Sequence, residues 1–479
     1  MKHAVTAAVV ATWLGMVAVL VHKQMPAPAT DVASLPPLPE GASSAQEEWF
    51  GVYQGDHKIG HSHRVVSRTA SGGYRFEESM ALRLAMLGSS QPLDTTLVTD
   101  TDAALTLRGF QFSLGSPAAT FTASGTSDGR TLSIRHGERG DPAVIPLDEP
   151  INLPSTLRPR IVAARPEPGA RFTHAVLSPI TFQKESITIT VEGHEMIDGH
   201  DALRIAEEHE GLKAHAWIDE TGGVLREEGV LGFVMRREPR ETALAGGSNE
   251  APLDLALAAR IPLAGSIGDP RDRSSLSLRV TGEARNRVLD DPPRQRMSGD
   301  VVTVVRETLP EHAERPSDGA FASYLGPSPF IEADDPDIVA TARSIVAGED
   351  DPIAKARRLL RWLRENMTRE PSLTVPSARE VLETRRGDCN EHAVLFAALA
   401  RASGIPARVA AGVVYLDGAF YYHAWTELWV GRWVTADAVF DQMPADPTHV
   451  KLIEGGPEQH LGLAGVLGRL GFTAVEEAS

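Results

Sequence analysis

The single cysteine of the chain, Cys389, stands directly before a segment in which apolar residues recur at helical spacing. Residues such as Leu395 and Leu399 lie on one face of this segment, which predicts an amphipathic helix from about Asn390 to Ser403. Gly404 fits the position at which helices commonly end. We therefore expect Cys389 at the first turn of a helix, where exposed backbone N–H groups and the helix dipole favour a thiolate.

The residues after this helix change to a pattern that is typical of strands. The segments Ala407–Leu416 and Ala419–Val430 are rich in Val, Tyr and Trp, and an Asp-Gly pair between them predicts a β-hairpin. His423 lies on the second of these strands, and a third strand ends near Asp437. A thiol at a helix start can then meet an imidazole and a carboxylate on neighbouring strands, as a nucleophile, its base and the group that orients the base.

Three short motifs carry these residues, and they follow one another as Gly387-Asp388-Cys389, His423-Ala424-Trp425 and Trp433 through Asp437. In this order, on a predicted helix and two strands, they resemble the transglutaminase-like superfamily. The resemblance extends over roughly Gly326 to Leu452 and implies a papain-like core of helices and an antiparallel sheet. It implies that the catalytic residues are Cys389, His423 and Asp437.

Five residues around this predicted triad allow more than one interpretation. The family commonly follows its aspartate with Pro and Thr, whereas Ala438 and Val439 stand here, so the turn after the aspartate can differ. Trp425 and Trp433 are candidates for oxyanion stabilisation or for the border of the substrate groove, with burial in the hydrophobic core as the alternative. We interpret His449 as a loop residue, with a place at the active site as the alternative.

A thiol beside an imidazole attacks a carbonyl carbon and forms an acyl-enzyme, which water or an amine resolves. We therefore predict thiol-dependent acyl transfer on peptide or protein amides, by a peptidase, amidase, deamidase or crosslinking enzyme. The alternative is a catalytically inactive scaffold or binding protein in a cell-envelope assembly. We expect neither a metal nor an organic cofactor, because His57, His61 and His63 lack carboxylate or cysteine partners at ligand spacing. The acyl acceptor and the oligomeric state stay open.

An apolar run at Ala4–Val21 is just long enough to span a bilayer. We expect an uncleaved membrane anchor within residues 1–24, with a cleaved signal peptide as the alternative. Both interpretations place the bulk of the chain outside the cytoplasm, as in a bacterial membrane-anchored protein with a transglutaminase-like domain. The net charge of −17 argues against a nucleic-acid partner, since binding to phosphates needs a basic surface.

The predicted fold class is α+β, with a large, mostly antiparallel β region before the papain-like core. Alternating strands with turns at short intervals indicate the β region, and Asp-Pro pairs at 335–336 and 351–352 predict the starts of two helices in the core. The expected divisions are a Pro/Ala linker at 25–46, a β-rich domain at 47–245, a β subdomain with a connector at 250–325, the catalytic domain at 326–455 and a C-terminal tail at 456–479.

Overall fold

The computed structural model of the protein describes residues 29–35 and 46–475, with gaps at 87, 118–119, 138–141, 179–183, 210–211, 230–231, 247–253, 255–256, 258, 312–318, 320, 329, 373–376 and 461–462. The predicted anchor at 1–24 lies outside the described residues, as does most of the predicted linker at 25–46. Among the helices that are described, none is long and apolar enough to cross a membrane.

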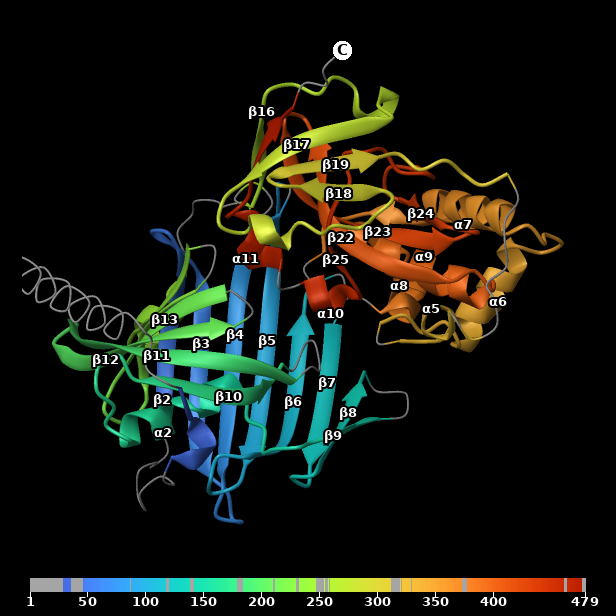
Figure 1. The fold of residues 1–479 in the computed structure, drawn as a ribbon. Coiled ribbons are helices and arrows are strands. Elements are labelled where there is room, and N and C mark those ends of the chain that lie inside the picture. The colour runs from blue at the N-terminus through green and yellow to red at the C-terminus, as the bar shows by residue number, and fades with distance from the viewer. Residues whose placement is uncertain are drawn as a thin grey trace, which may run out of the picture.

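A sheet of fifteen strands dominates the N-terminal half of the described chain (Figure 1). Its strands are β1 (Thr30–Asp31), β2 (Gln46–Gln54), β3 (His57–Arg68), β4 (Tyr74–Met86), β5 (Ser89–Thr101), β6 (Leu107–Gly115), β7 (Thr120–Ser127), β8 (Thr131–His136), β9 (Ala143–Pro146), β10 (Arg171–Leu177), β11 (Lys184–Ile197), β12 (His200–His209), β13 (Leu212–Ile218), β14 (Val224–Glu228) and β15 (Phe233–Arg237). They lie in the order β1-β10-β11-β12-β13-β14-β15-β2-β3-β4-β5-β6-β7-β8-β9, and of the described pairings in this sheet only β1 with β10 is parallel. Burial alternates along strands such as β7, as expected where one face is covered. The prediction of a large, mostly antiparallel β region is confirmed.

A second sheet of nine described strands contains the predicted core strands. Its members are β16 (Ile261–Ala264), β17 (Ser275–Thr281), β18 (Gln295–Ser298), β19 (Val301–Val305), β22 (Ala407–Leu416), β23 (Ala419–Trp429), β24 (Trp433–Ala436), β25 (Val450–Glu454) and β26 (Gly471–Ala474). They follow the order β18-β19-β17-β26-β16-β23-β22-β25, and β24 pairs with β23. One sheet therefore joins strands from the predicted subdomain, core and tail.

Helices pack beside the β22–β25 part of this second sheet (Figure 1). They are α5 (Ala322–Leu325), α6 (Pro336–Ile345), α7 (Pro352–Asn366), α8 (Ala378–Thr384) and α9 (Cys389–Ala402). Two short helices, α10 (Pro457–His460) and α11 (Ala464–Leu467), follow β25 in the chain and lie apart from this group. The two predicted Asp-Pro starts are confirmed: Asp335 accepts a hydrogen bond from the backbone N–H of Asp337, and Asp351 accepts one from that of Ala354. The largely buried α9 packs against α6, α7 and α8 and lies on β22 and β23.

The N-terminal sheet packs directly against the helical part of the chain. Phe330, which is 1% exposed, stacks its ring on Phe121 of β7 with centroids 5.7 Å apart. Buried residues of β6, β7 and β8 and of α6 to α9 belong to one continuous hydrophobic cluster. At the polar margin, the Gln91 side chain of β5 donates to the backbone oxygen of Pro371 at 2.8 Å. This shared core holds the N-terminal sheet in a fixed position beside the helices that precede Cys389.

Candidate active site

Cys389 is the first residue of α9, as the sequence predicts. The Asp388 carboxylate accepts from the backbone N–H of Asn390 at 2.9 Å. The Glu391 carboxylate reaches back to accept from the backbone N–H of Asp388 at 2.8 Å. These reciprocal bonds form a capping box, which satisfies N–H groups that a helix start leaves unpaired. The caps hold the backbone around Cys389 in one conformation.

Gly387 allows the tight entry into α9. Its φ is 149°, and a Cβ added there would lie 2.2 Å from Cγ of Glu391. We expect Gly387→Ala to lower the free energy of unfolding by about 2–5 kcal/mol, from backbone strain and displacement of the Glu391 cap. Urea unfolding measures this change. Gly418→Ala is the matched control, because Gly418 has a φ of 88° but open space around it, so only about 1 kcal/mol of strain is expected. Equal losses in both variants would contradict the role of the Glu391 contact.

The hairpin β22–β23 brings His423 beside α9. Asp417 and Gly418 form its two-residue turn with positive φ values of 47° and 88°, so the predicted hairpin is confirmed. Thr426 of β23 donates through its hydroxyl to the backbone oxygen of Ala393 in α9 at 3.0 Å. The backbone N–H of Ala424, the residue after His423, hydrogen-bonds to the Cys389 sulfur. The strand that carries His423 therefore runs directly past the sulfur.

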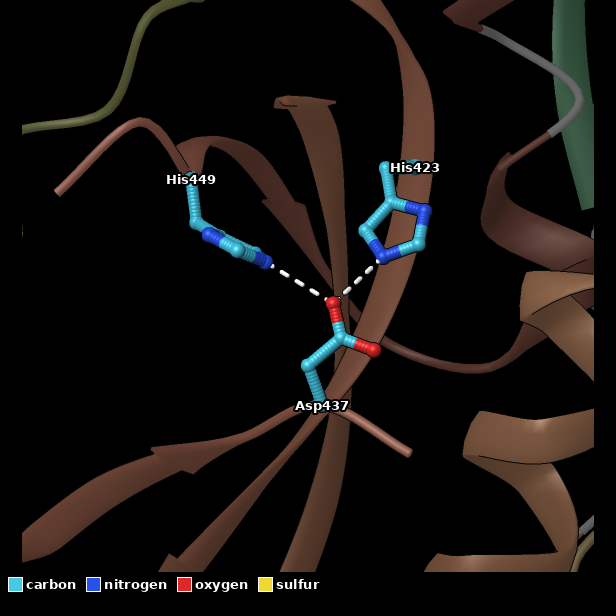
Figure 2. Close-up of side chains that lie close together, drawn as sticks. All are labelled: His423, Asp437 and His449. Atoms are coloured by element: carbon cyan, nitrogen blue, oxygen red, sulfur yellow. Dashed lines mark hydrogen bonds and ion pairs between the residues drawn. The ribbon is translucent and has the colours of Figure 1, made fainter. Parts of the chain in front are cut away.

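Asp437 follows β24 and binds the His423 ring. Nε2 of His423 lies 2.7 Å from Oδ2 of Asp437, and both side chains are buried (Figure 2). The other carboxylate oxygen, Oδ1, accepts from the backbone N–H groups of Val439 and Phe440 at 2.7 and 3.0 Å. The departure from the family at position 438 is compatible with this turn, because both donors come from later residues.

His449 meets the same carboxylate from the other side. Its Nε2 lies 2.9 Å from Oδ2 of Asp437, and its Nδ1 lies 3.1 Å from the backbone oxygen of Asp446. The ring is completely buried. His449 lies in the loop before β25, and its ring reaches Asp437 of the predicted site, as in the alternative interpretation. The Asp-Pro-Thr turn before His449 is visible in the sequence, but the direction of the ring depends on how β25 packs beside β22.

Burial and hydrogen bonding determine the charges of Asp437 and His449. Burial opposes ionisation of Asp437, but the charges and hydrogen bonds of His423 and His449 outweigh it and hold the pKa of Asp437 well below its ordinary range. Burial likewise opposes protonation of His449, but hydrogen bonds to Asp437 and Asp446 raise its pKa to about 9. At neutral pH, Asp437 is a carboxylate and His449 an imidazolium.

The half-buried Cys389 thiol has a different electrostatic setting from the one the sequence predicts. Burial and the nearby carboxylates of Asp388 and Glu391 raise its pKa well above the ordinary value, although the Ala424 N–H acts in the opposite direction. This direction is opposite to the stabilised thiolate that the sequence predicts, and burial is its largest cause. Within the described residues, no hydrogen bond joins the sulfur to the His423 ring. The raised pKa favours the protonated thiol over the thiolate.

Comparison with known proteins adds a family for one part of the chain. Residues 339–438 match the model of the transglutaminase-like superfamily. This segment is a transglutaminase-like domain. No curated protein matches the chain significantly.

Several solved structures resemble parts of the chain. One is a β-barrel-like protein of the domain of unknown function DUF1849 from Brucella abortus, with 10% identity over 40% of this chain and 94% of that chain and a TM-score of 0.33. Another, from Cytophaga hutchinsonii, is provisionally described as a cysteine protease, with 18% identity over 45% of this chain and 84% of that chain and a TM-score of 0.28. A third is the periplasmic domain of TgpA from Pseudomonas aeruginosa bound to ethylmercury, with 21% identity over 35% of this chain and 66% of that chain and a TM-score of 0.24.

The two tryptophans of the transglutaminase-like domain differ in position. Trp425 is 1% exposed, and its ring meets that of His449 edge-on at 5.3 Å. Trp433 is half-buried and packs against Tyr324 at 5.1 Å, with the Arg408 guanidinium 4.1 Å from its ring centroid. Trp425 thus encloses the histidine pair, and Trp433 belongs to an aromatic group at the end of β23. Their roles toward substrate stay predictions.

A polar cluster that the sequence does not indicate lies beside Cys389. The Tyr422 hydroxyl donates to Oδ1 of Asn390 at 2.7 Å, and Nδ1 of His460 lies 3.1 Å from the same hydroxyl. Nε2 of His460 donates to the backbone oxygen of Gly455 at 3.0 Å. Burial lowers the pKa of His460 to about 4, so its ring is neutral. Burial raises the pKa of Tyr422 well above its ordinary value. The members come from β23, α9 and α10, which only the tertiary structure brings together.

His423, Asp437 and His449 are also the residue types that bind transition metals, and one potential ligand atom from each lies within 4.8 Å of the others. Their hydrogen bonds already account for this proximity. An imidazolium has no lone pair to offer a metal, so the protonated His449 would first have to lose a proton. Within the residues that the structure describes, the arrangement is better explained as an ion-paired cluster.

Proposed function

We propose that this protein catalyses thiol-dependent acyl transfer on peptide or protein amides. One observation carries the proposal: His423, which is paired with the buried Asp437, lies on the strand that passes the sulfur of Cys389 at the start of α9. Asp437 occupies Nε2 of His423, which leaves Nδ1 on the opposite side of the ring (Figure 2). In the described part of the chain this nitrogen has no hydrogen-bond partner, so it is free to accept a proton. The match of residues 339–438 to the transglutaminase-like superfamily supports the same chemistry.

The reaction begins with a neutral thiol. Cys389 attacks the carbonyl carbon of the amide while Nδ1 of His423 takes the thiol proton, so an S–C bond forms and the carbonyl oxygen becomes an oxyanion. The backbone N–H of Cys389, at the open start of α9, is the first candidate to stabilise that oxyanion. His423 then returns the proton to the leaving amine as the C–N bond breaks. Water or a primary amine attacks the resulting thioester and releases Cys389.

The N-terminal sequence supports a cellular location for this activity. The apolar run at Ala4–Val21 supports a membrane anchor with the bulk of the chain outside the cytoplasm. The substrate would then be a peptide or protein of the cell envelope.

A catalytically inactive scaffold is the second candidate, and the raised pKa of the Cys389 thiol favours it. A scaffold needs the fold of the transglutaminase-like domain but no proton transfer from Cys389 to His423. The two candidates differ in whether a thioester forms.

Intact-protein mass spectrometry distinguishes the candidates. We expect wild-type protein incubated with activated esters of glutamine-containing peptides to gain the mass of one acyl group on Cys389, the single cysteine. Adding a fluorescent primary amine tests the acceptor: a labelled peptide indicates aminolysis, and free acid alone indicates hydrolysis. Cys389→Ala is the control and should acquire no adduct. A panel of peptides that leaves the wild type unmodified, while a small thiol reagent still labels it, would favour the scaffold.

A further inference from the structure

A second histidine shares the carboxylate of the proposed active site, and it lies on an element separate from the catalytic motifs. Asp437 accepts four hydrogen bonds: two backbone N–H groups at Oδ1, and the rings of His423 and His449 at Oδ2 (Figure 2). A carboxylate has about four acceptor positions, so this one is fully occupied. His449 is an integral part of the cluster, because removing it leaves a buried acceptor position empty.

The rings of His423 and His449 differ in the groups that surround Nδ1, the nitrogen that does not contact Asp437. Nδ1 of His449 faces the backbone oxygen of Asp446 at 3.1 Å, with the Asp446 carboxylate at 3.4 Å, and its Nε2 faces Asp437. All of these oxygens are acceptors, so both ring nitrogens must carry a proton. Nδ1 of His423 has no such acceptor among the described residues. The geometry therefore makes His449 a cation and, within the described chain, leaves Nδ1 of His423 without a carboxylate or carbonyl oxygen against it.

We propose that His449 is a positioning residue for the thiol chemistry, which holds Asp437 in place against His423 and offsets its negative charge. The inference rests on the proposed function, because it assigns His423 the role of base. The negative charge of Asp437 raises the pKa of the Cys389 thiol. With an imidazolium of His449 on the same oxygen, the pair is close to neutral, and this effect on the thiol is reduced.

The surroundings of the two rings strengthen the effect of the His449 charge on Asp437. The centroids of the two histidine rings are 5.6 Å apart, and both rings contact the same carboxylate oxygen of Asp437. Phe440 lies 5.1 Å from the His423 ring and Trp425 lies 5.3 Å from the His449 ring, and both limit solvent. The other ionisable groups around the cluster and Cys389 are Asp446, Asp388, Glu391, His392, Tyr422 and Arg369.

The test uses the single cysteine as its own reporter. The rate of Cys389 alkylation by iodoacetamide, measured against pH on the full chain, gives the ionisation midpoint of the thiol without any substrate. We expect His449→Gln, which keeps a hydrogen-bond donor but removes the charge, to move this midpoint to higher pH by about one unit or more, because the charge of Asp437 is then no longer offset and disfavours the thiolate. Below the midpoint, alkylation at a fixed pH should slow about tenfold for each unit.

His174→Gln is the matched control. His174 of β10 is also buried and bonds Asp31 and Asn152 at 2.9 and 2.6 Å, but it belongs to the N-terminal sheet. We expect this variant to lose stability without a change in the alkylation midpoint. An unchanged midpoint in folded His449→Gln protein would overturn the proposal and leave His449 a structural residue.

A second measurement needs no variant. In wild-type protein labelled with 15N-histidine, we expect one buried histidine with both ring nitrogens protonated at pH 7, assigned to His449 by comparison with His449→Gln or by its coupling to Val450. A neutral His449 at pH 7 would also overturn the proposal. Neither readout requires amide turnover. A protein that forms no acyl-enzyme therefore bears only on the proposed function, while the midpoint and the protonation state bear on the inference about His449.

Discussion

Replacing Cys389 by alanine should abolish acyl-enzyme formation and lower any amide turnover by about 10⁴-fold or more, because no other group can form the thioester. The free energy of unfolding should change by only about 1 kcal/mol, since the half-buried thiol is small and the caps of α9 come from Asp388 and Glu391. Turnover and urea unfolding of the same preparations measure the two effects separately.

His423→Ala should lower turnover less than Cys389→Ala does. It keeps the thiol but removes the proton acceptor, so we expect turnover to fall by about 10²–10⁴-fold. Cys389 should still react with small alkylating reagents at high pH. Turnover that persists in Cys389→Ala protein at a level near that of the wild type would contradict the assignment of the nucleophile.

Asp437→Ala should be the most destabilising single change in the site, with a loss of about 3–5 kcal/mol in the free energy of unfolding. The buried carboxylate accepts four hydrogen bonds, and its removal leaves two backbone N–H groups unpaired and the buried His449 imidazolium with Asp446 alone. From the sequence we expect a milder effect on turnover than for Cys389 or His423, because an orienting residue does not react. For stability we expect the opposite order.

Urea unfolding near pH 7 measures this loss, and Asp437→Asn provides the control. Asparagine keeps the volume and one acceptor oxygen but loses the negative charge, so we expect an intermediate loss. A second control is the double variant with His449→Leu, which removes the unpaired cation and should recover part of the stability. If Asp437→Ala is as stable as the wild type, the buried ion pair with His449 does not exist in solution.

Local signals in the sequence were sufficient for the elements that carry the proposed site. The start of α9, the Asp caps of α6 and α7 and the turn of the β22–β23 hairpin were all predicted correctly. Each depends on interactions within a few residues, such as a side-chain oxygen on a nearby N–H group or a positive φ at glycine. The approach of His423 to Asp437 was expected from the order of the strands and the family resemblance, and the roles of these residues and of Cys389 stay proposals.

The electrostatic state of the site could not be predicted from local signals in the sequence. The pKa of Cys389 is raised because burial and the Asp388 and Glu391 carboxylates outweigh the Ala424 N–H, and the balance depends on distances between groups that only the folded chain brings together. The ring of His449 is charged because β25 and the preceding turn direct its two nitrogens at two different acidic residues. The sequence alone does not distinguish His449 from histidines in other turns of the chain.

By itself, the sequence therefore determined the cysteine at a helix start, the hairpin with its histidine and the large antiparallel β region. The tertiary structure alone decided that β26 from the C-terminal segment enters the second sheet, that Phe330 joins the two β regions in one core, and that His449 shares Asp437 with His423. The reason is the range of the interactions. Caps and turns form between neighbours in the chain, whereas sheet order, shared burial and charge compensation arise between segments that meet only when the whole chain has folded.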